Sequence, residues 1–151
     1  MPRWIIGIGL VAVIAIGAFI FRDFLPSNAG ELKVGDCFDI PTGEEIGDVQ
    51  HHPCNEAHDG EVILVADFTG SDTYPSADKF DAWVNTECIA KAFPAYVGEP
   101  FEARDDLDLG YFYPKEAGWT KDDDKVMICY LTPAPSGKVT VSYAKAAPAA
   151  S

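Results

Sequence analysis

The feature that most constrains this chain is an unbroken apolar run near its beginning. Residues 4–21 read WIIGIGLVAVIAIGAFIF, 18 residues without a charge, and Arg3 precedes them while Arg22 and Asp23 follow. As a helix the run rises about 27 Å, close to the ~30 Å hydrocarbon core of a bilayer. It exceeds the ~7–15 apolar residues of a signal peptide. The run therefore predicts a transmembrane anchor. The alternative is a signal peptide cleaved near Ala29, which would release a secreted domain.

All four cysteines follow this run, at Cys37, Cys54, Cys88 and Cys129. An even number of cysteines in a small domain behind an export-type segment is typical of disulfides formed in an oxidising compartment. We therefore expect the N-terminus in the cytoplasm and the rest of the chain outside the cell membrane.

This interpretation divides the chain of 151 residues into five parts. We expect a single folded domain, because the length suits one domain with appendages rather than two domains. The predicted parts are a cytoplasmic N-terminus at 1–3, the anchor at 4–21, a linker at 22–30, the extracytoplasmic domain at 31–143 and a mobile tail at 144–151.

The charge of the outer part restricts its partners. From Gly30 onward the chain has 23 acidic residues and 9 Lys and Arg residues, which gives about −14. An acidic surface repels phosphate, so this part is not expected to bind nucleic acid or another polyanion.

Three apolar segments predict strands. Residues 61–68 and 126–131 are apolar on both faces and suit interior strands. Residues 138–143 (KVTVSY) alternate between apolar and polar side chains, as a half-buried strand does. Two prolines and a glycine lie between the last two segments, so we expect a hairpin there.

One principal helix is predicted between the first two strands, begun by Ser76 and ended at Phe93–Pro94. Its apolar residues share one face that includes Cys88. Four cysteines allow three pairings. A bridge from Cys88 to Cys129, on the 126–131 strand, is physically natural, and it leaves Cys37 with Cys54. The expected fold is α+β, with a small, mainly antiparallel sheet packed on one helix and two disulfides.

Residues 50–61 (QHHPCNEAHDGE) hold the densest group of functional side chains. Cys54 and His58, with His51 or His52, could supply a mixed sulfur and nitrogen site for zinc. That site needs a free thiolate, whereas outside the cytoplasm Cys54 is better used in a disulfide. We expect no metal, no cofactor and no catalytic residue, since the chain has none of the familiar catalytic motifs. His58 and Glu61 are then polar residues that hydrogen-bond the loop before the strand.

A second group is aromatic. Tyr111, Phe112 and Tyr113 precede Pro114, and Trp119 follows nearby. We expect these rings to pack on the sheet, because large aromatic side chains are usually mostly buried. The alternative is an exposed surface that contacts protein or glycan.

A set of motifs occurs in order along the chain: residues 32–37 (LKVGDC), Val49 to Val62, Tyr74–Pro75, Cys88, Tyr113–Pro114, Trp119 and Cys129. Taken together, these motifs resemble the septum-formation domain family, membrane-anchored extracytoplasmic domains of actinobacteria and related bacteria. Ala57 departs from a proline that is usual in the family, and residues 122–124 (DDD) replace a turn that usually carries an arginine. The resemblance implies a role in septum formation or the cell envelope, with His58 and Glu61 as polar positions of undetermined role.

The predicted function is therefore that of an interaction or structural module of the cell envelope, without enzymatic activity. Its expected partners are the membrane, through the apolar run, and envelope or division proteins; the sequence does not predict the oligomeric state. The rival hypothesis is a metal-dependent or hydrolytic domain that uses His51, His52, His58 and Glu61.

Overall fold

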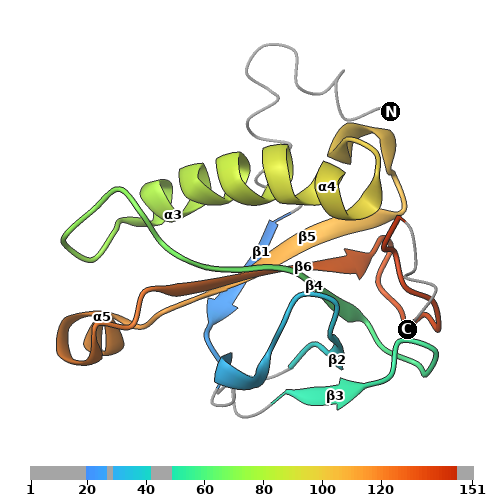
Figure 1. Ribbon diagram of the computed structural model, residues 1–151, viewed down its shortest axis with the longest axis horizontal. Coiled ribbons are helices and arrows are strands. Elements are labelled where there is room, and N and C mark those ends of the chain that lie inside the picture. Colours follow the sequence, from blue (N-terminus) through green and yellow to red (C-terminus); the bar gives the residue numbers. More distant parts are fainter. Residues whose placement is uncertain (1–19, 27–28, 42–48, 146–151) are drawn as a thin grey trace.

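The computed structural model describes residues 20–26, 29–41 and 49–145. These residues form a six-stranded sheet with the order β1-β5-β6-β4-β2-β3 (Figure 1). Neighbouring strands are antiparallel except β1 and β5, which are parallel. The mainly antiparallel sheet predicted from the sequence is thus confirmed. The strands are β1 (Ile20–Phe24), β2 (Cys37–Asp39), β3 (Gln50–His52), β4 (Gly60–Asp67), β5 (Leu107–Tyr113) and β6 (Val126–Pro133).

Strand β1 was not predicted. It pairs with β5 from Ile20 opposite Leu109 to Phe24 opposite Tyr113, and it comprises residues that were predicted to form the end of the anchor and the start of the linker. Most of the predicted anchor, residues 4–19, lies outside the described residues. Among those described, no helix is long and apolar enough to cross a membrane.

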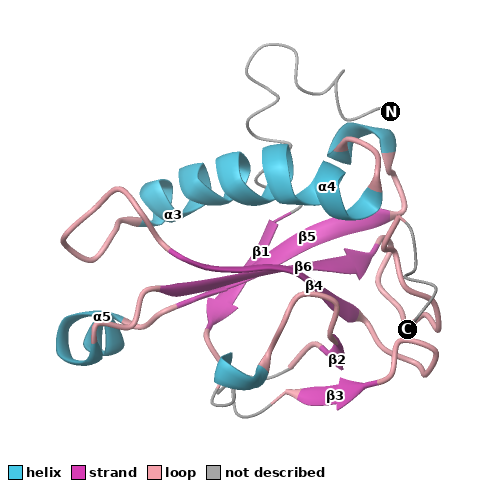
Figure 2. Ribbon diagram, viewed as in Figure 1, coloured by secondary structure: helices cyan, strands magenta, loops and turns pink. Residues whose placement is uncertain are grey.

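The principal helix covers one face of the sheet (Figure 2). It is a continuous rod from Ala77 to Val97, made of three consecutive segments. These are α3 (Ala77–Val84), a π-helical segment η2 (Asn85–Ala92) and α4 (Phe93–Val97). The Ser76 side chain caps its first turn by accepting a hydrogen bond from the N–H of Lys79, as predicted.

The predicted end of this helix at Phe93–Pro94 is wrong. A proline inside an α-helix lacks an N–H and clashes with the preceding turn. Pro94 instead lies in the first turn of α4, directly after the wider turn of η2, in which the Phe93 N–H donates to the carbonyl of Cys88, five residues back. The rod ends at Gly98, whose φ of 91° is left-handed and whose N–H donates to the carbonyl of Pro94.

Apolar side chains cover both faces of the central strands. On β6, Met127, Cys129 and Leu131 face the helix, while Ile128 and Tyr130 face the opposite core. This double burial explains why the strand is an uninterrupted apolar run. The helix-facing core also holds Phe80, Trp83, Val84, Cys88, Leu107, Leu109 and Tyr111, and the opposite core holds Leu32, Phe38, Val62 and Phe112.

The predicted packing of the aromatic group is confirmed. Tyr111 and Phe112 on β5 are fully buried, and Trp119 is 4% exposed. Trp119 lies on a short helix, α5 (Glu116–Asp122), that follows β5. The remaining short elements are η1 (Ala29–Glu31) and η3 (Phe101–Ala103), both 3-10 turns.

The predicted hairpin between 126–131 and 138–143 is wrong. Strand β6 lies between β4 and β5, which occupy both of its edges, so no edge is left for residues 138–143. That segment makes an isolated bridge between Val139 and His58 instead. We call residues 138–145 the C-terminal strap. The predicted mobile tail, 144–151, lies outside the described residues from 146 onward.

Both disulfides predicted from the sequence are present, Cys37–Cys54 and Cys88–Cys129. The second joins η2 to β6 with both cysteines fully buried. In the first, Cys37 is buried on β2, whereas Cys54, beyond β3, is partly exposed.

Candidate functional site

The structure separates the histidines that the sequence places together. His51 and His52 lie on β3, where successive side chains point to opposite faces of the strand. His52 Nε2 lies 2.8 Å from a carboxylate oxygen of Asp39, and His51 Nδ1 lies 3.9 Å from Asp36. Both histidines therefore sit beside acidic side chains at the edge of the sheet.

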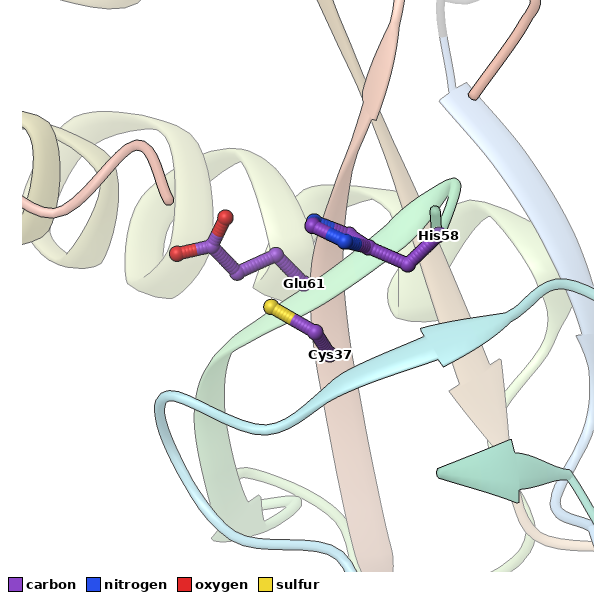
Figure 3. A group of neighbouring side chains, drawn as sticks. All are labelled: Cys37, His58 and Glu61. Carbon is purple, nitrogen blue, oxygen red and sulfur yellow. The ribbon is translucent and has the colours of Figure 1, made fainter. Parts of the chain in front are cut away.

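A different group converges in the interior. Ligand atoms of Cys37, His58 and Glu61 all lie within 4.8 Å of one another, and each residue is 1% exposed. The three side chains come from β2, from the loop before β4 and from β4 (Figure 3). The register places Cys37 opposite Glu61, which explains how β2 and β4 bring them together. The sequence predicted His58 and Glu61 but not Cys37.

Glu61 binds three separate parts of the chain. Its Oε2 accepts hydrogen bonds from the Tyr96 hydroxyl at 2.5 Å and the Ser142 hydroxyl at 2.7 Å. Its Oε1 accepts the Tyr143 N–H at 3.0 Å. A buried carboxylate is costly unless it is hydrogen-bonded, and these donors satisfy it. Glu61 therefore joins β4 to α4 and to the C-terminal strap.

His58 is held through its backbone and through one ring nitrogen. Its N–H and carbonyl both pair with Val139 of the strap, at 3.0 and 2.8 Å. Its Nδ1 donates to the carbonyl of Glu56 at 2.8 Å, which fixes the proton on that nitrogen because a carbonyl only accepts. The other nitrogen, Nε2, is buried and has no hydrogen-bond partner among the described residues.

Two further contacts fasten the strap. Lys138 Nζ lies 2.5 Å from an Asp39 carboxylate oxygen and 3.7 Å from Asp59. The hydrogen bond from Lys138 lowers the pKa of Asp39 and raises that of Lys138. At the other end, the N–H of Lys145 donates to the carbonyl of Tyr96 at 2.8 Å. The strap is therefore tied to β2, β4 and α4.

The two tyrosines beside Glu61 are both harder to ionise than free tyrosine. Burial raises the pKa of Tyr96, and its hydrogen bond to the negative Glu61 raises it further. Burial likewise raises the pKa of Tyr143, with added repulsion from Asp106 and Glu61. Both hydroxyls therefore stay protonated at neutral pH, which keeps Tyr96 a donor to Glu61.

With the disulfide closed, this group has little chemistry available. The Cys37 sulfur is bonded to Cys54, so it is neither a nucleophile nor an anionic metal ligand. The predicted hydrogen bond from His58 to the loop before β4 is present, whereas Glu61 bonds α4 and the strap instead of that loop.

A pocket of about 650 Å³ lies elsewhere, between η1, α5 and the sheet. It is lined mainly by apolar residues, with one lysine and one aspartate. No sequence pattern predicts this pocket, because its walls come from segments far apart in the chain. Its lining includes Leu25, Ala29, Leu32, Val65, Lys115, Asp124 and Val126.

Four neighbours of the predicted polar pair were not predicted from the sequence: Cys37, Tyr96, Ser142 and Tyr143. One signal was available, since Glu61 is an acid that begins an otherwise apolar strand run and so needed donors. Which residues would supply them depends on the path of the strap.

Comparison with known proteins supports one assignment. The family model described as septum formation matches residues 34–150, most of the chain, and confirms the resemblance expected from its motifs. No curated protein and no solved structure gives a significant match to this chain.

Proposed function

This chain belongs to the septum-formation family, and on that premise we propose that it is an extracytoplasmic structural or interaction module of the bacterial envelope. An N-terminal helix anchors it in the membrane. It acts at or near the division septum by contacting envelope or division proteins, and it catalyses no reaction.

The observation that carries this proposal is the use made of its polar residues. The Glu61 carboxylate accepts hydrogen bonds that join β4 to α4 and to the strap, and the Cys37 sulfur is bonded in a disulfide. Such a site maintains a rigid shape instead of turning over a substrate. The two disulfides also suit a compartment in which thiols are oxidised.

The apolar run supports the anchor. Residues 4–19 precede β1 directly, so a helix over this run would lead straight into the edge of the sheet. A domain attached in this way would stay close to the membrane surface. The strong negative charge of the outer part would keep it away from polyanionic envelope polymers.

Two measurements test the placement. Carbonate extraction of membranes should leave the full chain in the pellet, while a variant lacking residues 2–19 should be released. A fluorescent fusion that matures outside the cytoplasm should accumulate at division sites. Recovery of the full chain in the soluble fraction would contradict the anchor. An even distribution of the fusion over dividing cells, together with normal septa in cells that lack the gene, would contradict the role at the septum.

The alternative is a hydrolytic domain built on His58 and Glu61. Two observations favour it: Nε2 of His58 has no hydrogen-bond partner among the described residues, and a ring nitrogen of His58 lies within 4.8 Å of a Glu61 carboxylate oxygen. The full chain is incubated with isolated cell-wall polymer, and His58→Gln and Glu61→Gln serve as matched variants. Release of soluble fragments that both variants abolish would replace the structural function with an enzymatic one.

A further inference from the structure

Three potential metal ligands meet in the interior of this protein, and one of them is blocked by a covalent bond. Ligand atoms of Cys37, His58 and Glu61 lie within 4.8 Å of one another (Figure 3). All three side chains are buried. Thiolate, imidazole and carboxylate are the three ligand types that zinc takes from proteins.

The unpaired nitrogen of His58 is an independent sign of a missing ligand. A buried polar atom normally has a partner, and each exception requires an explanation. In the neutral imidazole with its proton on Nδ1, Nε2 has a lone pair inside the protein, and no donor among the described residues bonds to it. A lone pair of this kind fits a cation.

The groups around these ligands already have the arrangement of an outer coordination shell. Metal-bound histidines usually donate their other N–H to a carbonyl or carboxylate, as His58 does to Glu56. Metal-bound carboxylates are themselves hydrogen-bonded, as Glu61 is by Tyr96 and Ser142. Two of the three ligands are therefore held in place before any metal arrives.

We propose that opening the Cys37–Cys54 disulfide creates a zinc site, formed by the Cys37 thiolate, Nε2 of His58 and the Glu61 carboxylate. Cys54, bonded to Cys37 in the closed form, supplies a fourth ligand. Two thiolates and one carboxylate carry −3, so zinc reduces the buried charge to −1. Neighbouring ligands of tetrahedral zinc lie about 3.5 Å apart, so the group contracts by about 1 Å on binding.

The chemistry balances as two steps. A dithiol reductant transfers two electrons to the disulfide, becomes a disulfide itself and leaves thiols on Cys37 and Cys54. Zinc then binds both sulfurs as thiolates and releases two protons. Since Cys37 cannot bond to Cys54 and ligate zinc as an anion at once, the disulfide and the metal exclude each other. The partly exposed Cys54 is the sulfur through which a reductant gains access.

A single variant tests this without any reductant. Cys54→Ser leaves Cys37 as a permanent free thiol and keeps the Cys88–Cys129 disulfide intact. The full chain, purified in mild detergent and free of chelator, is titrated with Co²⁺, whose thiolate charge-transfer absorption reports bonding to sulfur. We expect one Co²⁺ per chain in Cys54→Ser, displaced by Zn²⁺, and none in the oxidised parent.

Matched variants separate this ligand set from the one suggested by sequence. Adding His58→Gln or Glu61→Gln to Cys54→Ser should weaken binding at least 10-fold, since even outer-shell partners contribute 10–100-fold. Adding His52→Gln should leave the affinity unchanged. Loss on His52→Gln, or none on His58→Gln, would overturn the assignment.

Folding is checked by the near-ultraviolet circular dichroism of the buried tryptophans. A Cys54→Ser chain with the parent spectrum and no bound Co²⁺ would refute the site. If that variant loses the spectrum, the reduced parent is titrated instead, and zinc should slow alkylation of Cys37 and Cys54 at least 10-fold. No protection there would equally refute the site. The result of the titration does not depend on whether the protein lies at the septum, so a failure of the zinc site and a failure of the proposed function are distinguishable.

Discussion

Glu61 provides the most direct test of how this fold is held together. Replacing it with alanine removes the acceptor for three donors, the hydroxyls of Tyr96 and Ser142 and the N–H of Tyr143. A hydrogen bond to a charged acceptor contributes about 1.5–3 kcal/mol, so the simple sum is about 4.5–9 kcal/mol. Both hydroxyls can rotate toward other acceptors or water, which lowers the expected loss for Glu61→Ala to about 3–5 kcal/mol.

Two milder variants should fall in order below it. Glu61→Gln keeps one acceptor oxygen and should cost about 1–2 kcal/mol. Tyr96→Phe removes one donor and should cost a similar amount. Because the two residues contact each other, Glu61→Ala combined with Tyr96→Phe should show a coupling energy of at least about 1 kcal/mol.

The assay is urea unfolding of the oxidised full chain, followed by the fluorescence of its buried tryptophans. Glu102→Ala is the matched control, since Glu102 is exposed and should change stability by less than about 0.5 kcal/mol. A loss below about 1 kcal/mol for Glu61→Ala, or full additivity with Tyr96→Phe, would refute the reasoning that Glu61 joins the strap to the domain.

Three further predictions concern packing, cross-linking and pH. Gly110→Ala would place a Cβ 2.4 Å from the ring of Tyr130, which lies opposite on β6, and should lower the free energy of unfolding in urea by about 1–3 kcal/mol. Gly30→Ala, with no atom within 4 Å of its added Cβ, should lower it far less. Removing Cys88–Cys129, which spans 41 residues, by a double alanine substitution should lower stability by about 4 kcal/mol in the chain-entropy model; an unchanged urea midpoint would contradict it. Folding raises the pKa of Tyr96 above its ordinary value of 10. The stability that Tyr96 contributes is therefore complete below pH 10 and is lost as the pH rises above it. Tyr96→Phe should make the fall in unfolding free energy above pH 10 shallower by about 1.4 kcal/mol per pH unit. Equal slopes for the two chains would show that Tyr96 ionises normally.

The sequence predicted much of this fold because several signals were local. The apolar stripe of the helix identified Cys88 as buried, and the apolar run 126–131 identified an interior strand, so their disulfide followed from two local patterns. The predictions were wrong where a segment with a local strand or helix-end pattern found different surroundings in the folded chain. Residues 138–143 alternate as a strand does, yet both edges of β6 were already occupied. Pro94 predicts a helix end, yet it lies in the first turn of α4, which continues directly from the π-helical segment η2.

The candidate site also combines residues that the sequence predicted with residues that it did not. His58 and Glu61 could be singled out from the sequence, because a histidine and an acid stand at the entrance to an apolar strand. Their neighbours could not be, since Cys37, Tyr96 and Ser142 come from positions 24, 35 and 81 residues away from Glu61. Strand register and the path of the strap decide which of these side chains meet.

By itself, then, the sequence predicted the family through its ordered motifs, and the α+β class and the buried faces through periodicity, which acts over a few neighbouring residues. It allowed three disulfide pairings and favoured the one that the structure shows. Only the tertiary structure decided that β1 joins the sheet, that the C-terminal strap bridges to His58 instead of pairing with β6, and that His58 and Glu61 meet Cys37 rather than His51 and His52. Those outcomes depend on which surfaces remain unpaired after the strands are ordered, and no local pattern in the chain records that order.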